Sequence, residues 1–242
     1  MDNEKIARLQ QMIDESHNIV FFGGAGVSTE SNIPDFRSTD GLYHQTYKYP
    51  PEIMVSHSFF VHHTEEFYDF YKNKMIFPDA QPNKAHLKLA ELEQAGKLSA
   101  IVTQNIDGLH QKAGSKNVFE LHGSVHRNYC QKCHRFYDVN YMVEADGVPY
   151  CEACGGIIKP DVVLYEEGLD SNTIQGAVNA ISNADMLIIG GTSLVVYPAA
   201  GMIDYFRGKY LAVLNRDATS RDKQADICIT DPIGEVLGQI TV

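Results

Sequence analysis

Residues 18–26 read NIVFFGGAG, a run of bulky apolar side chains that passes directly into a glycine-rich turn. A short apolar run closed by glycines is typical of a fully buried strand. Glycines at its end let main-chain N–H groups approach a phosphate, and the Ser28 hydroxyl can donate to a phosphate oxygen. The turn is not a complete GxGxxG pattern, and no acidic residue ends a strand about 20 positions later. Alone, it is equally consistent with a plain strand-to-helix connection.

The rest of the chain repeats this alternation of short apolar strands and amphipathic helices. Asn83 is placed to cap a helix that carries Ala85, Leu89 and Leu92 on one face. Further strands are expected at residues 99–103, 186–189, 210–214 and 226–230, with helices around 174–181 and from Pro232. This order predicts an α/β fold, a Rossmann-type doubly wound parallel sheet covered on both faces.

A second turn of small residues, Gly190-Gly191-Thr192-Ser193, follows the apolar run at 186–189. The carboxyl ends of parallel strands share one edge of the sheet, and open α/β sheets bind their ligands in the crevice there. The two turns together therefore predict a nucleotide site.

Two segments interrupt the alternation, and we expect them to form a small inserted domain, a zinc ribbon plus a helical and loop module. Residues 29–57 are long and rich in Pro, Gly, Ser and Tyr, which is typical of a functional loop, and residues 59–71 are predicted to be helical. Residues 125–158 carry two cysteine pairs. We predict a large domain from residues 1–28, 76–124 and 159–242, and a small one from residues 29–75 and 125–158.

Four of the five cysteines form two close pairs, Cys130 with Cys133 and Cys151 with Cys154, separated by 17 residues. This is the spacing of a zinc ribbon, in which two tight turns present four thiolates to one ion. Four thiolates leave no open position for a substrate, so the expected zinc is structural. An iron–sulfur centre is the alternative that the spacing leaves open.

The formal net charge of −11 argues against a general nucleic-acid binder and favours basic partners such as lysine-rich peptides, although acidity also simply keeps a protein soluble. The first 17 residues lack the basic and apolar regions of a signal peptide. Residues 186–203 are uncharged, but their glycines and proline favour a strand, a turn and a helix start over a membrane span. We expect a cytoplasmic monomer without nucleic-acid or membrane partners.

Several segments, in this order and spacing, make nearly the whole chain resemble the sirtuins, the NAD-dependent protein deacylases. They are residues 24–28 (GAGVS), 33–37 (IPDFR), 103–110 (TQNIDGLH), 121–123 (LHG), both cysteine pairs, 191–194 (GTSL) and Asn215. The resemblance implies a protein-lysine deacetylase with NAD as co-substrate, acetyl-lysine proteins as partners and a structural zinc.

The resemblance also implies where NAD binds, in the crevice between the two domains. The residues implied to hold its diphosphate are Ala25, Gly26, Ser28, Thr192 and Ser193, with Gly24 and Gly191 beside them. Gln104 and Asn105 are implied to contact the nicotinamide ribose and Asp107 the nicotinamide amide. Asn215 is implied to bind the adenine ribose, and Ile227 or Cys228 to border the adenine. Phe36 and Arg37 are implied to lie on a loop that orders when NAD binds.

The implied catalytic residues are His122 and Asn105. In sirtuin chemistry the acetyl oxygen attacks the ribose carbon that bears nicotinamide, nicotinamide leaves and an alkylimidate forms. His122 then acts as general base on a ribose hydroxyl, which suits a neutral imidazole. The products are nicotinamide, deacetylated lysine and O-acetyl-ADP-ribose. Structural roles stay open for two residues: Asp107 as a cap of the Gly108 turn, and Arg37 in an ion pair with a loop acid.

The acetylated peptide is implied to add as a strand between residues 163–167 and 194–196. The residues predicted to contact it are Val163, Tyr165, Glu166, Leu194 and Val196. Sirtuins usually have Phe-Gly-Glu where this chain has Tyr165-Glu166-Glu167, which changes the groove and adds a carboxylate that favours basic flanking residues. Asn32 likewise stands where sirtuins usually have Gly, a milder change because Asn tolerates left-handed backbone.

The acyl group is predicted to be neutral, acetyl first. Sirtuins that remove succinyl groups use a Tyr and an Arg after the Asp-Phe-Arg motif. Tyr43, Tyr47 and Tyr49 are present here, but no Arg occurs between Arg37 and Arg127, and Lys48 is the exception that weakens the argument.

Three other functions use parts of the same pattern. An ADP-ribosyltransferase would use the same crevice, but His122, Asn105 and the groove segments favour deacylation. A sensor of NAD or ADP-ribose would be expected to have lost His122 or Asp107. A zinc-ribbon binding module would leave both glycine-rich turns unexplained.

Overall fold

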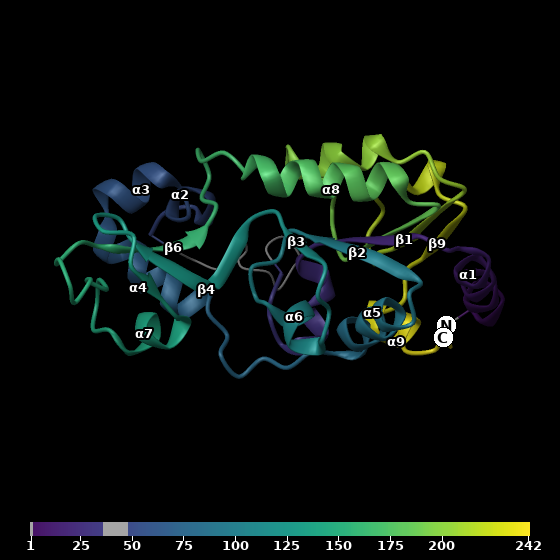
Figure 1. Ribbon diagram of the computed structural model, residues 1–242, viewed down its shortest axis with the longest axis horizontal. Helices are drawn as coiled ribbons and strands as arrows, with labels where there is room; N and C mark the ends of the chain where they lie inside the picture. The colour runs from purple at the N-terminus through teal and green to yellow at the C-terminus, as the bar shows by residue number, and fades with distance from the viewer. Residues whose placement is uncertain (1, 36–47) are drawn as a thin grey trace.

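The apolar run at residues 19–22 forms the centre of a parallel sheet, as strand β1 (Ile19–Gly23) (Figure 1). The computed structural model describes residues 2–35 and 48–242. These residues form a six-stranded sheet of order β3-β2-β1-β7-β8-β9, all parallel. The other strands are β2 (Leu98–Thr103), β3 (Val118–Glu120), β7 (Met186–Gly190), β8 (Tyr210–Leu214) and β9 (Ile227–Ile229). The strand order reverses between β1 and β7, which confirms the doubly wound, Rossmann-type prediction.

Both faces of this sheet are buried, and that is why its strands show no polar alternation. Ile19 and Phe21 pack on the side of helices α1 (Asn3–Glu15), α5 (Lys84–Gln94) and α9 (Ile233–Leu237). Val20 and Phe22 pack on the opposite side, against α8 (Ser171–Asn183) and the 3-10 helix Ala199–Tyr205. Figure 1 shows α8 along one face and α5 with α9 on the other, with the two termini together at one end. Each fully buried side chain of this size contributes about 1.5–3 kcal/mol.

Asn83 caps α5 as predicted, accepting a hydrogen bond from the Ala85 N–H at 2.9 Å. Its amide also donates to the Val27 carbonyl at 2.8 Å and to the Ser31 hydroxyl at 3.0 Å. One side chain thus starts a core helix and fixes the backbone that follows the first glycine-rich turn.

A second, antiparallel sheet of order β5-β4-β6 lies beyond the carboxyl edge of the large one, at the left of Figure 1. Its strands are β4 (Gly123–Cys130), β5 (Phe136–Tyr137) and β6 (Ile158–Val162). Helices α2 (Pro51–Met54), α3 (His57–His62), α4 (Thr64–Lys74) and α7 (Val139–Glu144) lie with it. Aromatic side chains such as Phe67, Tyr68 and Tyr71 form a core here that is separate from those of the parallel sheet.

The structure differs from the expected elements in two places. The predicted helix over residues 59–71 is two helices, which separate at His63, where φ is −134°; the Thr64 hydroxyl donates to the Phe60 carbonyl, the group that its N–H would use in a continuous helix. Strand β3 and the short helix α6 (Leu109–Ala113) were not expected, since elements this short carry too little periodicity. None of the helices described in residues 2–35 and 48–242 is long and apolar enough to cross a membrane, and the uncharged stretch at 186–203 is β7, a turn and the start of a 3-10 helix.

Candidate active site and cysteine cluster

The two glycine-rich turns contact each other through their main chains. The Gly24 N–H donates to the Gly190 carbonyl at 3.2 Å, and the Gly26 N–H donates to the Gly191 carbonyl at 2.8 Å. A β-carbon on Gly26 would lie only 2.8 Å from the Gly191 α-carbon, so side chains there would push the turns apart. The turns follow β1 and β7, where the strand order reverses, and they therefore meet at the switch point of the sheet.

A cavity of about 650 Å³ opens at this edge and extends to the small sheet. Most residues predicted to bind NAD or the peptide line it together. They are Gly24, Ala25, Gly26, Ser28, Gln104, Asn105, Asp107, His122, Gly191, Thr192, Ser193 and Asn215, with Val163, Tyr165, Glu166 and Val196 at the predicted peptide segments. The size suits a dinucleotide-class ligand, since ligand pockets usually measure about 300–1,000 Å³.

Ser28, Asn105 and Asp107 form a hydrogen-bonded group in the wall of the cavity. The Ser28 hydroxyl donates to Asp107 Oδ2 at 2.7 Å and accepts from Asn105 Nδ2 at 3.1 Å. Asp107 Oδ1 accepts from the Leu109 N–H at 2.9 Å, so the turn-capping role left open for Asp107 is present. Because the Ser28 hydroxyl is already donating, its predicted bond to a phosphate requires this contact to open.

His122 is held as a neutral base by its neighbours. Its Nδ1 lies 3.0 Å from the Gln104 carbonyl oxygen, which can only accept, so Nδ1 carries a proton and Nε2 has the lone pair in the neutral ring. Burial lowers the pKa of His122, and the bond to the Gln104 carbonyl offsets that shift only in part. His122 lies between β3 and β4, at the junction of the two sheets. The arrangement can therefore accept a proton from a ligand in the cavity at neutral pH.

The two predicted peptide segments border the cavity from opposite sheets. The Val163 N–H donates to the His122 carbonyl at 3.0 Å, which connects one segment to the histidine. The main-chain N–H groups of Glu166, Val195 and Val196 donate to no residue of the described chain. Unpaired main-chain groups on facing segments are what an added peptide strand requires.

Two of the predicted site residues do not line the cavity. Cys228 lies within β9, half-buried, its thiol contacts the Asp222 carbonyl, and it does not line the cavity, so its place beside the adenine stays a prediction. Residues 230–233 line it instead, because they follow the carboxyl end of β9. The Leu194 side chain is 5% exposed and packs in the core, so it offers no side-chain contact. Phe36 and Arg37, with Tyr43 and Tyr47, lie outside the described residues.

Sequence reasoning missed other parts of the wall. Residues 216–218 follow β8 and line the cavity, as do Tyr71, Lys74 and Met75 from the end of α4. The first group carries a usable signal, because segments directly after parallel strands share this edge. The residues at the end of α4 carry no such signal in the sequence, because only the packing of α4 against the small sheet brings them to the cavity.

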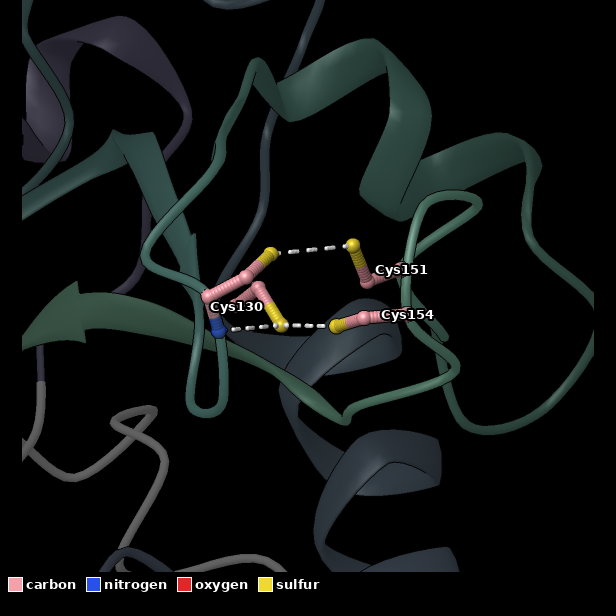
Figure 2. Close-up of side chains that lie close together, drawn as sticks. Cys130, Cys151 and Cys154 are labelled. Carbon is pink, nitrogen blue, oxygen red and sulfur yellow. Dashed lines mark hydrogen bonds between the residues drawn. The ribbon is translucent and has the colours of Figure 1, made fainter.

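The four paired cysteines converge at a distance from the cavity, which none of them lines. Figure 2 shows Cys130, Cys151 and Cys154 with their sulfurs turned toward one another. Cys130 and Cys154 have sulfurs 3.4 Å apart, Cys133 and Cys151 have sulfurs 3.5 Å apart, and all four lie within 4.8 Å of one another. A tetrahedral zinc with Zn–S bonds of about 2.3 Å requires sulfurs roughly 3.8 Å apart, whereas a disulfide requires about 2.05 Å. The cluster fits a structural zinc.

Comparison with known proteins points to one family. A model of the Sir2 family matches residues 24–198. The NAD-dependent protein deacetylase of Clostridium perfringens is 63% identical over 241 residues, covering 98% of this chain and 99% of that protein. A solved structure of Sir2 with a p53 peptide and NAD+ superposes with a TM-score of 0.85 at 39% identity, covering 96% of this chain and 95% of that one. Another, with a deacetylated p53 peptide and 3'-O-acetyl ADP ribose, has a TM-score of 0.88 at 38% identity over 96% of both chains. The chain belongs to the Sir2 family.

Proposed function

We propose that this protein is an NAD-dependent protein-lysine deacetylase that yields nicotinamide, the free lysine and O-acetyl-ADP-ribose. The observation that carries the proposal is His122, which burial favours in the neutral form, whose Nδ1 proton points to the Gln104 carbonyl, and which lies in the wall of the cavity at the switch point of the sheet. The curated relative with 63% identity is named for this activity.

The residues divide the work as follows. NAD supplies the ribose carbon to which the acetyl oxygen adds and the hydroxyl that later receives the acetyl group. Nε2 of His122 accepts the proton of that hydroxyl, while Asn105 and Asp107, joined through Ser28, orient the nicotinamide end. The two turns hold the diphosphate, and Asn215 follows β8 toward the adenine end.

The experiment is incubation with an acetyl-lysine peptide, with and without NAD, followed by mass spectrometry of peptide and nucleotide. Wild type should lose acetyl only with NAD, and His122→Ala should be nearly inactive. His17→Ala is the matched control, since its exposed side chain does not line the cavity and should leave turnover unchanged. An unchanged peptide together with ADP-ribose attached to protein would show that the protein is an ADP-ribosyltransferase instead. Binding of NAD without its consumption would show that it is a sensor.

We propose that the enzyme prefers neutral acyl groups. Lys48, the residue that weakened this prediction, is an exposed side chain 3.7 Å from Glu66 and does not line the cavity. The basic side chains that do, among the described residues, are Lys74 and Arg216, and Lys74 already has a partner. Turnover of acetylated and succinylated versions of one peptide tests this, and a faster succinyl reaction would refute it.

We also propose the division into a large domain (residues 1–28, 76–124 and 159–242) and a small one (29–75 and 125–158), which the separate hydrophobic cores support, except that β6 and Leu164 pack with the small domain. A cytoplasmic location is proposed because four thiolate ligands persist in a reducing compartment. A monomer that binds no nucleic acid or membrane is proposed from the net charge of −11, and light scattering with and without DNA tests it.

A further inference from the structure

The wall of the cavity at residues 163–167 contains an unusual backbone conformation. Glu166 has φ of 76°, in the left-handed region that favours glycine, and it occupies the position where sirtuins usually have glycine. The groove therefore keeps the turn that glycine would make, although Glu166 carries a side chain. The contacts of the Glu166 carboxylate hold this turn in place.

Glu166 is attached to helix α3 of the small domain through one serine. Its Oε2 accepts from the Ser58 N–H at 2.8 Å and from the Ser58 hydroxyl at 2.6 Å. Ser58 lies in the first turn of α3, where main-chain N–H groups have no partner inside the helix. These two bonds are the main cause of a lowered pKa of Glu166, so the carboxylate stays ionised. Both are charge-assisted bonds, the stronger class.

The residues on either side of Glu166 make matching contacts with the same helix start. The Tyr165 N–H donates to the Val55 carbonyl at 3.0 Å, and the Tyr165 carbonyl accepts from the His57 N–H at 2.9 Å. His57 Nδ1 also donates to Glu167 Oε1 at 2.8 Å, while Glu167 Oε2 accepts from the Leu164 N–H at 2.9 Å. The groove segment is therefore bound along its length to residues 55–58, and Glu166 is the contact that glycine at this position would not make.

We propose that Glu166 is a positioning residue, which fixes the groove wall by holding Ser58 and so prepares it for the acetylated peptide. The Glu166 main-chain N–H donates to no residue of the described chain, and the anchor holds it in place for the incoming strand. Glycine would reach the same backbone conformation but would have to be ordered by the peptide itself, which costs affinity. This inference rests on the proposed deacetylase function and adds to it how this chain binds its peptide.

The test separates the carboxylate from the backbone conformation. Glu166→Gly keeps access to the left-handed region and removes the anchor, so the KM for an acetyl-lysine peptide should rise about tenfold, equal to about 1.4 kcal/mol. The kcat and the KM for NAD should stay within about twofold of wild type, because the anchor touches neither. Ser58→Ala should give a smaller rise, since its main-chain N–H still donates. Combining Ser58→Ala with Glu166→Gly should add nothing.

Two further variants distinguish an anchor from simple attraction of basic peptides. Glu166→Gln keeps an acceptor for Ser58 without the charge, so the peptide KM should stay much closer to wild type than in Glu166→Gly. Glu52→Ala removes an exposed carboxylate of α2 that makes no hydrogen bond in the described chain, and it should leave the KM unchanged. If Glu166→Gln is as impaired as Glu166→Gly, or Glu52→Ala is equally impaired, charge acts instead and the positioning role is overturned.

Failure of this inference is distinguishable from failure of the proposed function. Wild type that turns over the peptide with NAD, beside a Glu166→Gly variant with the same peptide KM, overturns the positioning role alone. Wild type that leaves every acetylated peptide unchanged overturns the deacetylase proposal and this inference with it. Fluorescence anisotropy of a labelled acetyl-lysine peptide without NAD provides a second readout, in which Glu166→Gly should bind about tenfold more weakly, by the same conversion.

Discussion

The contact between the two glycine-rich turns can be tested by adding one methyl group at Gly191. A β-carbon there would lie 2.3 Å from the Val27 nitrogen, about 1.1 Å short of the 3.4 Å at which ordinary contact begins. Gly191 also has φ of 58°, which disfavours any side chain. Gly191→Ala therefore carries two penalties, a conformational one of about 1 kcal/mol and an overpacking one of roughly 1–3 kcal/mol.

A matched variant isolates the first penalty. Gly96, between α5 and β2, has φ of 74° and no atom within 4 Å of an added β-carbon. Gly96→Ala should therefore lower the free energy of unfolding by about 1 kcal/mol, and Gly191→Ala by about 2–4 kcal/mol. Denaturant unfolding compares them. NAD affinity by calorimetry should fall ten- to a hundredfold only in Gly191→Ala, because displacement of a binding element by about 1 Å can cost that much.

The result that would refute this reasoning is equal stability of the two variants together with unchanged NAD affinity in Gly191→Ala. The main-chain contact of the turns would then not be what builds the site, and the close approach would be relieved by a harmless shift.

Three further predictions concern protons and metal. Burial lowers the pKa of His122, and the residue acts as a base only when it is neutral. The value of kcat/KM should therefore stay constant down to pH 6.5 and fall only below it. A loss of kcat/KM that begins above pH 6.5 would contradict the assignment of His122 as the base. Burial also lowers the pKa of His86 to about 4 and of His110 to about 3, so the unfolded chain takes up protons first, and the unfolding temperature should fall as pH drops from 6.5 toward 4. His110→Leu should flatten that decline, by up to roughly 1.4 kcal/mol per pH unit. Cys154→Ser should reduce bound zinc, measured by a metal indicator on the unfolded protein, and loosen the small domain while the large one stays folded; full zinc content would refute the four-thiolate site.

The sequence predicted the parallel sheet because its central strands are apolar on both faces and because β1 and β7 end in glycines, signals that depend on few residues. Sequence reasoning missed features that depend on a contact between residues far apart in the chain, or on the backbone conformation of a single residue. The break between α3 and α4 occurs at one residue, His63, and Leu194 turns into the core although Ser193 and Val196 line the cavity. Cys228 lies within β9 and not after its carboxyl end, where residues 230–233 line the cavity, so its contact with the adenine stays a prediction.

The position of His122 connects it through one strand to the cysteine cluster, although no cysteine lines the cavity. The histidine stands between β3 of the large sheet and β4 of the small one, and Val163, which follows β6, is bonded to its carbonyl. Cys130 ends β4, so a zinc ion held by the four cysteines would fix the far end of the strand that begins beside His122. The two glycine-rich turns, in contrast, follow β1 and β7 of the large sheet. Loss of zinc should therefore weaken peptide binding and turnover more than it weakens NAD binding. Peptide binding and turnover need the small sheet in place, whereas NAD binding does not.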